Sequence, residues 1–301
     1  MQTINLFDKE IIVNDCLCGP SPESKYKANP SLRLYIKIND ECNAKCKFCV
    51  NEKSCDFGKL DFSKLEYVIR YLDSKNLLHS VGITGGEPMI DPEKVNMIIN
   101  LIYGINPNAE VQVNTNGINL LKFLEFDHIN DLESIHISRH HYTDELNYQI
   151  FNSKSVASSH DIRLLQQGLE DKRIININTL VMKDYINNLN EIKKMLNHVG
   201  EMGVYKNGFV SLIKCNNYAN NQFINFNDIF NNLDSNFYLG HHFYQGKFCE
   251  CIDGMYLTNN NQLVEFYARM VKDCECPYTS QLVYTSDNRV KSGFSGKVLC
   301  K

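Results

Sequence analysis

The sequence contains no tryptophan and no long apolar run, and its charges nearly balance. No apolar stretch approaches about 18 residues, the length that a membrane-spanning helix requires, so we expect no membrane span. The first ten residues, MQTINLFDKE, lack a basic start followed by an apolar segment, so we expect no signal peptide. The net charge of −4 gives no strong field that would attract a nucleic acid or a membrane. We therefore expect an ordinary soluble protein.

Cysteine, by contrast, is abundant, with 12 residues in a chain of 301. In a chain without an export signal, so many cysteines indicate a reducing, cytoplasmic location and metal ligation. Disulfide pairing is the alternative interpretation.

Three of the cysteines, Cys42, Cys46 and Cys49, share one short loop with the sequence CNAKCKFC. Thiolate is the soft ligand of iron–sulfur clusters, so this loop could hold three irons of a [4Fe–4S] cube. The nearest further cysteine is Cys55, six residues after Cys49, so no fourth cysteine follows at a fixed short spacing. The loop thus predicts a cluster with one open iron where a small molecule can chelate. The alternatives are free thiols or a zinc loop, although zinc prefers paired two-residue spacings and histidines.

Strand and helix patterns alternate from residue 32 to about 214, which predicts βα units around a parallel sheet. Apolar, β-prone runs predict strands at 32–38, 80–84, 109–114, 134–138, 173–181 and 208–214. Helical spacing predicts helices around 65–72, 92–104, 118–125, 158–170 and 188–198, the first capped by Asp61 or Ser63. A polar loop is expected at 139–145, and further strands at 11–13, 281–285 and 289–291. Residues 1–31 form an N-terminal extension, 32–214 the βα region, and 215–301 a cysteine-rich C-terminal region.

A second motif, Gly85-Gly86-Glu87-Pro88, follows the predicted strand 80–84. Active sites of α/β barrels lie at this end of the strands. Two glycines allow the backbone to approach a ligand closely. Glu87 could accept a hydrogen bond from a protonated amine or hold the loop, and Pro88 fixes the chain exit. A plain turn into a helix is the alternative interpretation of the motif alone.

The two motifs together resemble the signature of the radical S-adenosylmethionine (radical SAM) superfamily, over about residues 32–214. The resemblance implies a partial (βα)6 barrel and a [4Fe–4S] cluster on Cys42, Cys46 and Cys49. In that family the open iron binds the methionine part of S-adenosylmethionine (SAM), and the Gly-Gly-Glu-Pro motif contacts its amino group. The cluster cleaves SAM reductively to a 5′-deoxyadenosyl radical, which abstracts hydrogen from a substrate. A flavodoxin or ferredoxin electron donor is implied as well.

Positions at the ends of later strands add candidate cofactor contacts. Asn116 ends the third strand and could contact ribose or hold its loop, with a turn as the alternative. In similar enzymes a serine and a basic residue at the fourth strand's end contact ribose and the methionine carboxylate, which implies these roles for Ser138 and Arg139. Further candidates at the same mouth are His140 and His141 for substrate binding or proton transfer, and Asn176 or Asn178 for ribose.

The C-terminal region contains two Cys-x-Cys pairs, which could supply an auxiliary cluster or a zinc site. Their spacing does not match the common Cys-x-x-Cys pattern of such extensions. The four residues are Cys249, Cys251, Cys274 and Cys276.

Within the superfamily, the motifs look closest to the molybdopterin-precursor cyclase branch and the peptide-modifying enzymes related to it. That branch's two-glycine tail is absent, since the chain ends VLCK. The substrate is left open between a peptide and a small molecule or nucleotide. A glycyl-radical activase and a non-catalytic iron–sulfur or zinc protein are the rival functions.

Overall fold

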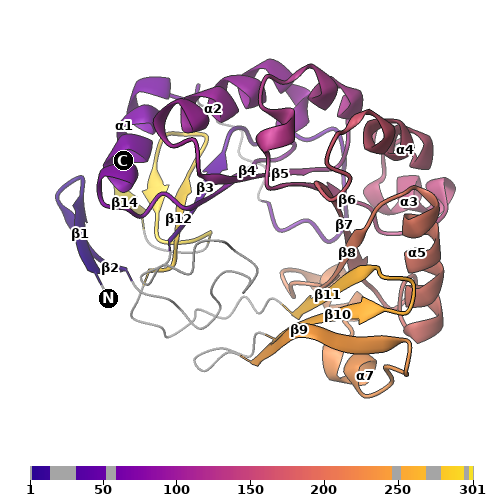
Figure 1. Ribbon diagram of the computed structural model, residues 1–301. Helices are drawn as coiled ribbons and strands as arrows, with labels where there is room; N and C mark the ends of the chain where they lie inside the picture. Colours follow the sequence, from indigo (N-terminus) through magenta and orange to yellow (C-terminus); the bar gives the residue numbers. More distant parts are fainter. Residues whose placement is uncertain are drawn as a thin grey trace.

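A computed structural model describes residues 2–13, 32–51, 59–245, 252–268, 279–294 and 298–300. Its centre is a curved sheet with helices along the outer side (Figure 1). Six parallel strands in sequence order form the middle of this sheet, as the alternating pattern predicts. They are β3 (Arg33–Lys37), β4 (Ser80–Thr84), β5 (Glu110–Thr115), β6 (Ser134–Ser138), β7 (Ile175–Val181) and β8 (Lys206–Ser211). The predicted α/β fold with a parallel sheet is confirmed.

The helices between these strands pack their apolar faces on the sheet's convex side. They are α1 (Phe62–Ser74), α2 (Pro92–Ile105), α3 (Asp144–Phe151), α4 (Ser159–Gly168) and α5 (Leu189–Glu201), with 3-10 turns η1 (Pro88–Ile90), η2 (Leu120–Glu125) and η3 (Ile129–Asp131). Asp61 caps α1, because its side chain accepts from the Lys64 N–H. The predicted helix 118–125 is the 3-10 segment η2, and α3 begins inside the predicted polar loop 139–145.

The two faces of the parallel strands differ sharply. Val111, Val113, Ile135 and Ile137 are fully buried in the core against the helices. The alternate residues point to the concave face, because successive strand side chains point to opposite faces. The side chains of this face in β5, β6 and β7 are mostly polar, with Leu180 as the apolar exception: Glu110, Gln112, Asn114, Ser134, His136, Ser138, Asn176 and Asn178.

Strands from residues 215–301 extend both edges of the same sheet. At one edge, β11 (Leu263–Ala268) pairs in parallel with β8 and continues into antiparallel β10 (Ile252–Thr258) and β9 (Phe237–Gln245), with α6 (Asn217–Gln222) and α7 (Phe226–Phe230) before them. At the other, β12 (Gln281–Tyr284) pairs in parallel with β3, followed by β13 (Val290–Lys291) and β14 (Val298–Cys300). The predicted strands 281–285 and 289–291 therefore exist, and they lengthen the sheet.

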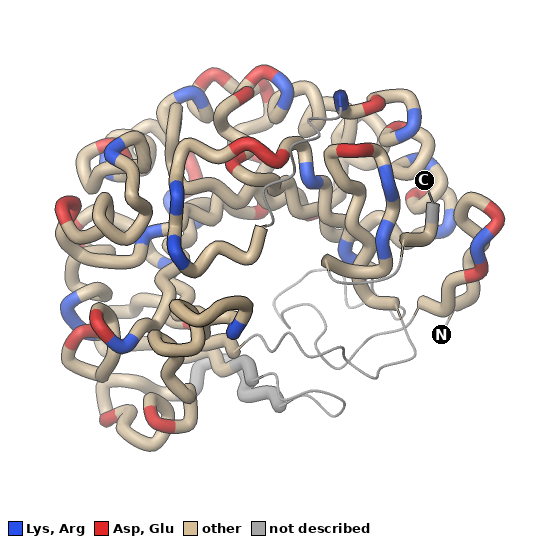
Figure 2. The backbone as a smooth tube through the Cα atoms, turned by 180° about the vertical axis from the view of Figure 1, so that it is seen from behind, with Lys and Arg blue, Asp and Glu red and all other residues tan. Residues whose placement is uncertain are grey.

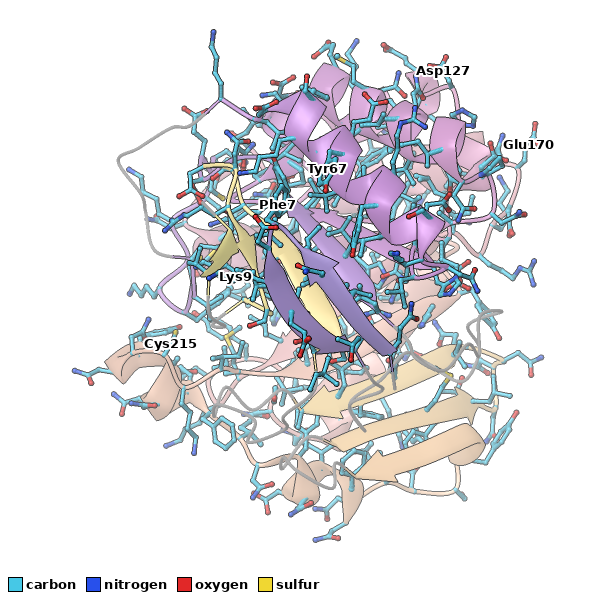
Figure 3. All side chains as sticks on the ribbon, turned by 90° about the vertical axis from the view of Figure 1, so that its left-hand side faces the viewer. Phe7, Lys9, Tyr67, Asp127, Glu170 and Cys215 are labelled. Carbon is cyan, nitrogen blue, oxygen red and sulfur yellow. The ribbon has the colours of Figure 1, made fainter. Side chains whose placement is uncertain are left out.

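The N-terminal segment forms a hairpin of β1 (Gln2–Leu6) and β2 (Lys9–Val13), so the predicted strand 11–13 has a partner. Phe7 and Asp8 both have positive φ, as the tightest hairpin turns require. The Phe7 ring lies 5.3 Å from that of Tyr67 on α1, and both are labelled in Figure 3. The hairpin thus packs against the first βα unit.

Acidic and basic residues are interspersed over the helical exterior in Figure 2, in keeping with the net charge of −4. Among the described helices, none combines the length and apolarity needed to cross a membrane.

Asn288 joins the β12–β13 turn to the start of α1. Its Oδ1 accepts from the Asp61 N–H at 2.7 Å and the Tyr284 hydroxyl at 3.0 Å, and its Nδ2 donates to the Lys59 carbonyl at 2.8 Å. Its φ of +63° is left-handed. We expect Asn288→Gly to lower the free energy of unfolding by about 1–2 kcal/mol through lost hydrogen bonds. Asn288→Ala should cost about 1 kcal/mol more through backbone strain. Denaturant midpoints for the two variants test this order; equal midpoints for both would contradict it.

Candidate active site

The three cysteines lie on the loop after β3, which we call the cysteine loop (residues 42–49). The loop is pinned by the segment after α3. The Lys45 N–H donates to the Phe151 carbonyl at 2.9 Å, and the Asn43 amide donates to the Ser155 carbonyl at 3.1 Å. Ala44 is buried among Phe151 and Val156. The backbone of this loop is therefore held while Cys42 and Cys49 stay exposed and Cys46 half-buried.

The thiols share one electrostatic environment. Burial, then the charges of Cys49 and Cys42, raise the pKa of Cys46 to about 12, and burial raises the pKa of Cys42. The negative charges of the thiolates raise one another's pKa, and a bound metal cation would offset this repulsion. Cys42 Sγ accepts from the Ala44 N–H at 3.4 Å and lies 3.8 Å from Asn116 Nδ2. Hydrogen bonds of this kind orient a cysteine sulfur and tune the metal that it binds.

The donor set fits an iron–sulfur cluster better than a single ion. Over the described ranges, no three His, Cys, Asp or Glu side chains are grouped closely enough to hold one metal ion. A cube distributes its ligands over several irons, so soft thiolates on a short, partly exposed loop suit it. The zinc alternative gains no support from this geometry.

The Gly-Gly loop (residues 85–88) packs directly on the chain leading into the cysteine loop. The Gly86 N–H donates to the Asn39 carbonyl at 2.9 Å, and the Glu87 N–H donates to the Glu41 carbonyl at 2.7 Å. A Cβ on Gly86 would lie 2.1 Å from the Glu41 oxygen, and one on Gly85 would lie 2.6 Å from Asn39 Oδ1. Glycine is therefore required here because backbone meets backbone.

The side chain of Glu87 points inward and holds the loop, one of the two roles expected for it. Its carboxylate accepts from the Thr115 hydroxyl at 2.5 Å, the Asn116 N–H at 2.6 Å and the Met89 N–H at 3.0 Å. Burial raises the pKa of Glu87 to about 7, and these hydrogen bonds limit the rise. Glu87 thus ties the Gly-Gly loop to the end of β5.

Asn116 connects this junction to the cysteine loop. Its Nδ2 donates to Asn43 Oδ1 at 2.7 Å, while its Oδ1 accepts from the Ile118 N–H at 3.1 Å. Loop holding is therefore visible in its contacts, and the expected ribose contact stays a prediction. The structure brings Asn116, the Gly-Gly loop and the cysteine loop together, although they come from three different strand ends.

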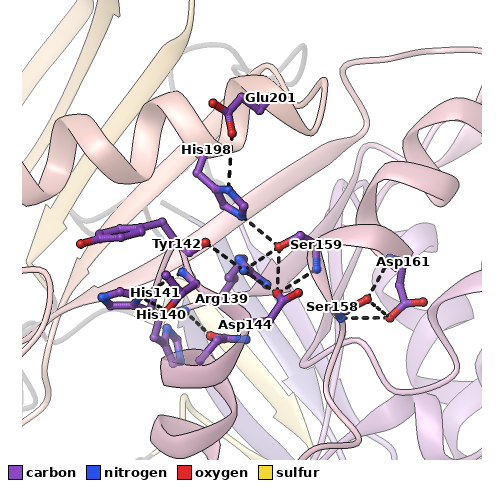
Figure 4. A network of polar contacts seen from close by, with 12 residues as sticks. Arg139, His140, His141, Tyr142, Asp144, Ser158, Ser159, Asp161, His198 and Glu201 are labelled. Carbon is purple, nitrogen blue, oxygen red and sulfur yellow. Dashed lines mark hydrogen bonds and ion pairs between the residues drawn. The ribbon is translucent and has the colours of Figure 1, made fainter.

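Arg139 follows β6 and is fully buried in the polar network of Figure 4. Its Nη2 donates to Asp144 Oδ1 at 2.7 Å and to the Ser159 hydroxyl at 2.8 Å, and that hydroxyl lies 3.0 Å from His198 Nε2. Its Nε and Nη1 have no partner among the described residues. Both donor pairs that can hold a carboxylate by two parallel bonds include Nη2, which already donates to Asp144 and Ser159, so Nε and Nη1 are two separate single donors.

His140 and His141 occupy different environments. Burial, then the charge of Arg139, lowers the pKa of His140 to about 3, so its ring is neutral near pH 7. The ring lies 4.8 Å from that of Phe151 and 5.3 Å from that of Phe48 in the cysteine loop. His140 therefore supports the cysteine loop. His141 Nδ1 accepts from the Thr143 N–H at 3.0 Å at the start of α3.

The structure adds three contacts that local patterns did not reveal. The Cys215 thiol, labelled in Figure 3, lies 3.6 Å from the Phe48 carbonyl oxygen, and Asn216 Nδ2 donates to the Lys47 carbonyl at 3.0 Å. Asn39 Nδ2 donates to the Glu87 carbonyl at 2.9 Å. The cysteine pairs Cys249/Cys251 and Cys274/Cys276 lie outside the described residues.

Comparison with known proteins agrees with this arrangement of loops. The family model of the radical SAM superfamily matches residues 36–198, more than half of the chain. The chain therefore belongs to the radical SAM superfamily, a class of enzymes that use SAM and an iron–sulfur cluster.

Individual curated relatives match parts of the chain. It is 32% identical to the GTP 3′,8-cyclase of Rhodopirellula baltica over 110 residues, which are 35% of this chain and 29% of that protein. It is 28% identical to the GTP 3′,8-cyclase of Clostridium perfringens over 172 residues, 54% of this chain and 50% of that protein. The chain thus spans half or less of the length of these curated relatives.

A solved structure extends the fold comparison to most of the chain. Streptococcus suis SuiB bound to S-adenosylmethionine superposes with a TM-score of 0.61 over 90% of this chain and 63% of that protein, at 12% identity. At this identity the likeness concerns the fold alone.

The buried Glu87 predicts a dependence of stability on pH. Its folded pKa of about 7 lies above the unfolded value of 4.5, so its contribution is fully present below pH 4.5. It is lost as pH rises through 7, by up to roughly 3 kcal/mol. Denaturant unfolding of wild type and Glu87→Gln at pH 5 and pH 8 isolates this change, because a glutamine side chain does not titrate. A stability difference independent of pH would refute the raised pKa.

Proposed function

We propose that this chain holds a [4Fe–4S] cluster on Cys42, Cys46 and Cys49 and acts as a SAM-cleaving radical enzyme. The observation that carries the proposal is the packing of the cysteine loop against the Gly-Gly loop and Asn116. When bound, a reduced cluster supplies the electron that splits SAM into methionine and a 5′-deoxyadenosyl radical, which abstracts hydrogen from a substrate.

The residues of this chain would bind and orient SAM. Gly85 and Gly86 have no side chains, which allows the backbone of the Gly-Gly loop to approach its neighbours closely. For the same reason its carbonyls can meet the methionine amino group. Arg139, whose Nε and Nη1 have no partner among the described residues, is the proposed donor of a single hydrogen bond to the methionine carboxylate. Asn116 and Ser138 are the proposed ribose contacts, and Pro88, the first residue of η1, fixes the direction of the loop exit.

The proposed fold rests on the order of the strands and the curvature of the sheet. We infer that β3 to β8 with their helices form a partial (βα)6 barrel, supported by their sequential parallel order and curved sheet (Figure 1). SAM would bind at the carboxyl ends of the strands, where the candidate residues gather. A flavodoxin or ferredoxin is the proposed electron donor, and a reducing cytoplasm suits the cysteine content.

The substrate is proposed to be a peptide, with a small molecule or nucleotide as the second candidate because curated relatives are GTP 3′,8-cyclases by name. Among the described strand lysines, Lys37 pairs with Asp40 and Lys206 with Glu265, so these two do not favour a phosphate-bearing substrate. A glycyl-radical activase and a non-catalytic metal-binding protein are the rival functions, and the latter predicts no SAM cleavage.

Replacing the cysteine loop thiols tests the radical mechanism. After anaerobic loading with iron and sulfide and reduction with dithionite, wild type should convert SAM to 5′-deoxyadenosine. The Cys42/Cys46/Cys49→Ala variant should lose at least about 99% of this activity and its loop iron, because no thiolate ligand is left. Chromatographic assay of 5′-deoxyadenosine and iron analysis measure both.

Cys215→Ala is the matched control, because this thiol touches the cysteine loop without being a proposed ligand. It should keep its iron and form 5′-deoxyadenosine within about twofold of wild type. A fully loaded, reducible wild type that forms no 5′-deoxyadenosine would favour the metal-binding rival.

Iron content also tests the C-terminal cysteine pairs. We propose that Cys249, Cys251, Cys274 and Cys276 hold an auxiliary cluster, so wild type should contain about eight irons per chain. Changing all four to alanine should lower this to about four while the cysteine loop keeps its cluster. About four irons in wild type would rule the auxiliary cluster out.

A further inference from the structure

The concave face of the sheet carries a cluster of amides that the proposed SAM site does not use. Asn176 and Asn178 share this face of β7, with their Nδ2 atoms 3.4 Å and 3.1 Å from Nδ1 of His136 on β6. His136 Nε2 lies 2.7 Å from the Ser134 hydroxyl. Since both amides donate to Nδ1, the imidazole proton sits on Nε2 and is donated to Ser134. His136 thus fixes which way both amides point.

This orientation leaves two carbonyl acceptors without a donor. Asn176 is only 2% exposed. Its Oδ1 and that of Asn178 are buried and accept no hydrogen bond from any described residue. A buried acceptor without a donor lowers stability, so such a group calls for a ligand that supplies an N–H or O–H.

The lysine next to Asn176 is already paired with a carboxylate. Lys206 is the register neighbour of Asn176 on β8, and its Nζ lies 3.2 Å from a carboxylate oxygen of Glu265 on β11. A lysine already paired with a carboxylate has little attraction left for a phosphate. The unused acceptor of Asn176 therefore calls for a hydrogen-bond donor rather than a phosphate.

The spacing of Asn176 and Asn178 along β7 matches the repeat of an extended peptide. Residues two apart on a strand lie about 7 Å apart along its axis. In an extended peptide, alternate N–H groups point to the same side with this same repeat. Every extended peptide backbone therefore presents N–H donors at this repeat.

We propose that Asn176 and Asn178 accept hydrogen bonds from two alternate backbone N–H groups of an extended peptide substrate lying along β7. The proposal rests on the radical SAM function above and names its substrate class. It makes the β7 amides specificity-determining residues, and it excludes a nucleoside triphosphate from this face.

Peptide pools with and without backbone donors test the proposal. Cluster-loaded protein with SAM is incubated with a randomised pool of N-acetylated, C-amidated octapeptides, with the same pool methylated at every backbone nitrogen, or with GTP. Retained molecules are identified by affinity-selection mass spectrometry. Wild type should retain peptides of the first pool alone. Asn176→Ala and Asn178→Ala should each lower their retention about tenfold, the effect of one lost hydrogen bond.

Two further variants separate contact from folding. A Cβ in Gly208→Ala would lie 2.9 Å from Asn178 Oδ1, so it should displace that carbonyl and mimic Asn178→Ala. Asn114→Ala is the control, because Asn114 is the register neighbour of His136 on β5 and its Nδ2 donates to the Ile83 carbonyl. It should retain peptides within about twofold of wild type. Iron content and substrate-free 5′-deoxyadenosine formation verify that each variant is intact.

The outcomes distinguish failure of the peptide subsite from failure of the radical function. Equal retention of both pools, unchanged retention by the asparagine variants, or retention of GTP but no peptide would overturn the peptide subsite while 5′-deoxyadenosine still forms. Absence of 5′-deoxyadenosine from wild type would instead overturn the radical function.

Discussion

The buried carboxylate of Glu87 joins the loops on which the candidate site depends. It accepts hydrogen bonds from η1 and from the end of β5 at the same time. An ionised carboxylate offers acceptors in several directions and no donor, so it can satisfy three donors that a glutamine could not all meet. Asn116, held by this junction, reaches the cysteine loop through Asn43. The position of the proposed cluster ligands is therefore coupled to a carboxylate on the loop after the neighbouring strand β4.

Local pattern predicted the middle of the fold because its elements bury one face each. The strands 80–84 and 134–138 have the predicted bounds, since their apolar residues alternate and meet the helices on one side. The helix α3 was missed because its acidic first turn, Asp144 and Glu145, looks like a polar loop without helical periodicity. The edge strands β9 to β11 were missed because their pairing with β8 depends on distant partners.

In the candidate site, too, some features follow from local sequence and others depend on distant contacts. Cysteine spacing and the Gly-Gly-Glu-Pro motif are local, so the sequence alone predicted Cys42, Cys46, Cys49 and the Gly-Gly loop. Cys215 touches the cysteine loop across a sequence separation of 167 residues, and Asn39 meets Glu87 across 48. Contacts over such distances depend on strand order, which propensity does not report. A single asparagine before a motif carries no signal until its partner is known.

The composition of β5, β6 and β7 explains why this sheet can carry chemistry. Parallel sheets that are covered on both faces read as continuous apolar runs. Here the segments EVQVN, SIHIS and ININ alternate apolar with polar residues. The apolar half packs on the helices and supplies stability. The polar half faces inward, where amides and His136 hydrogen-bond one another and still leave the acceptors of Asn176 and Asn178 unused. Alternation within parallel strands is thus a sequence signal that one face is kept for a ligand.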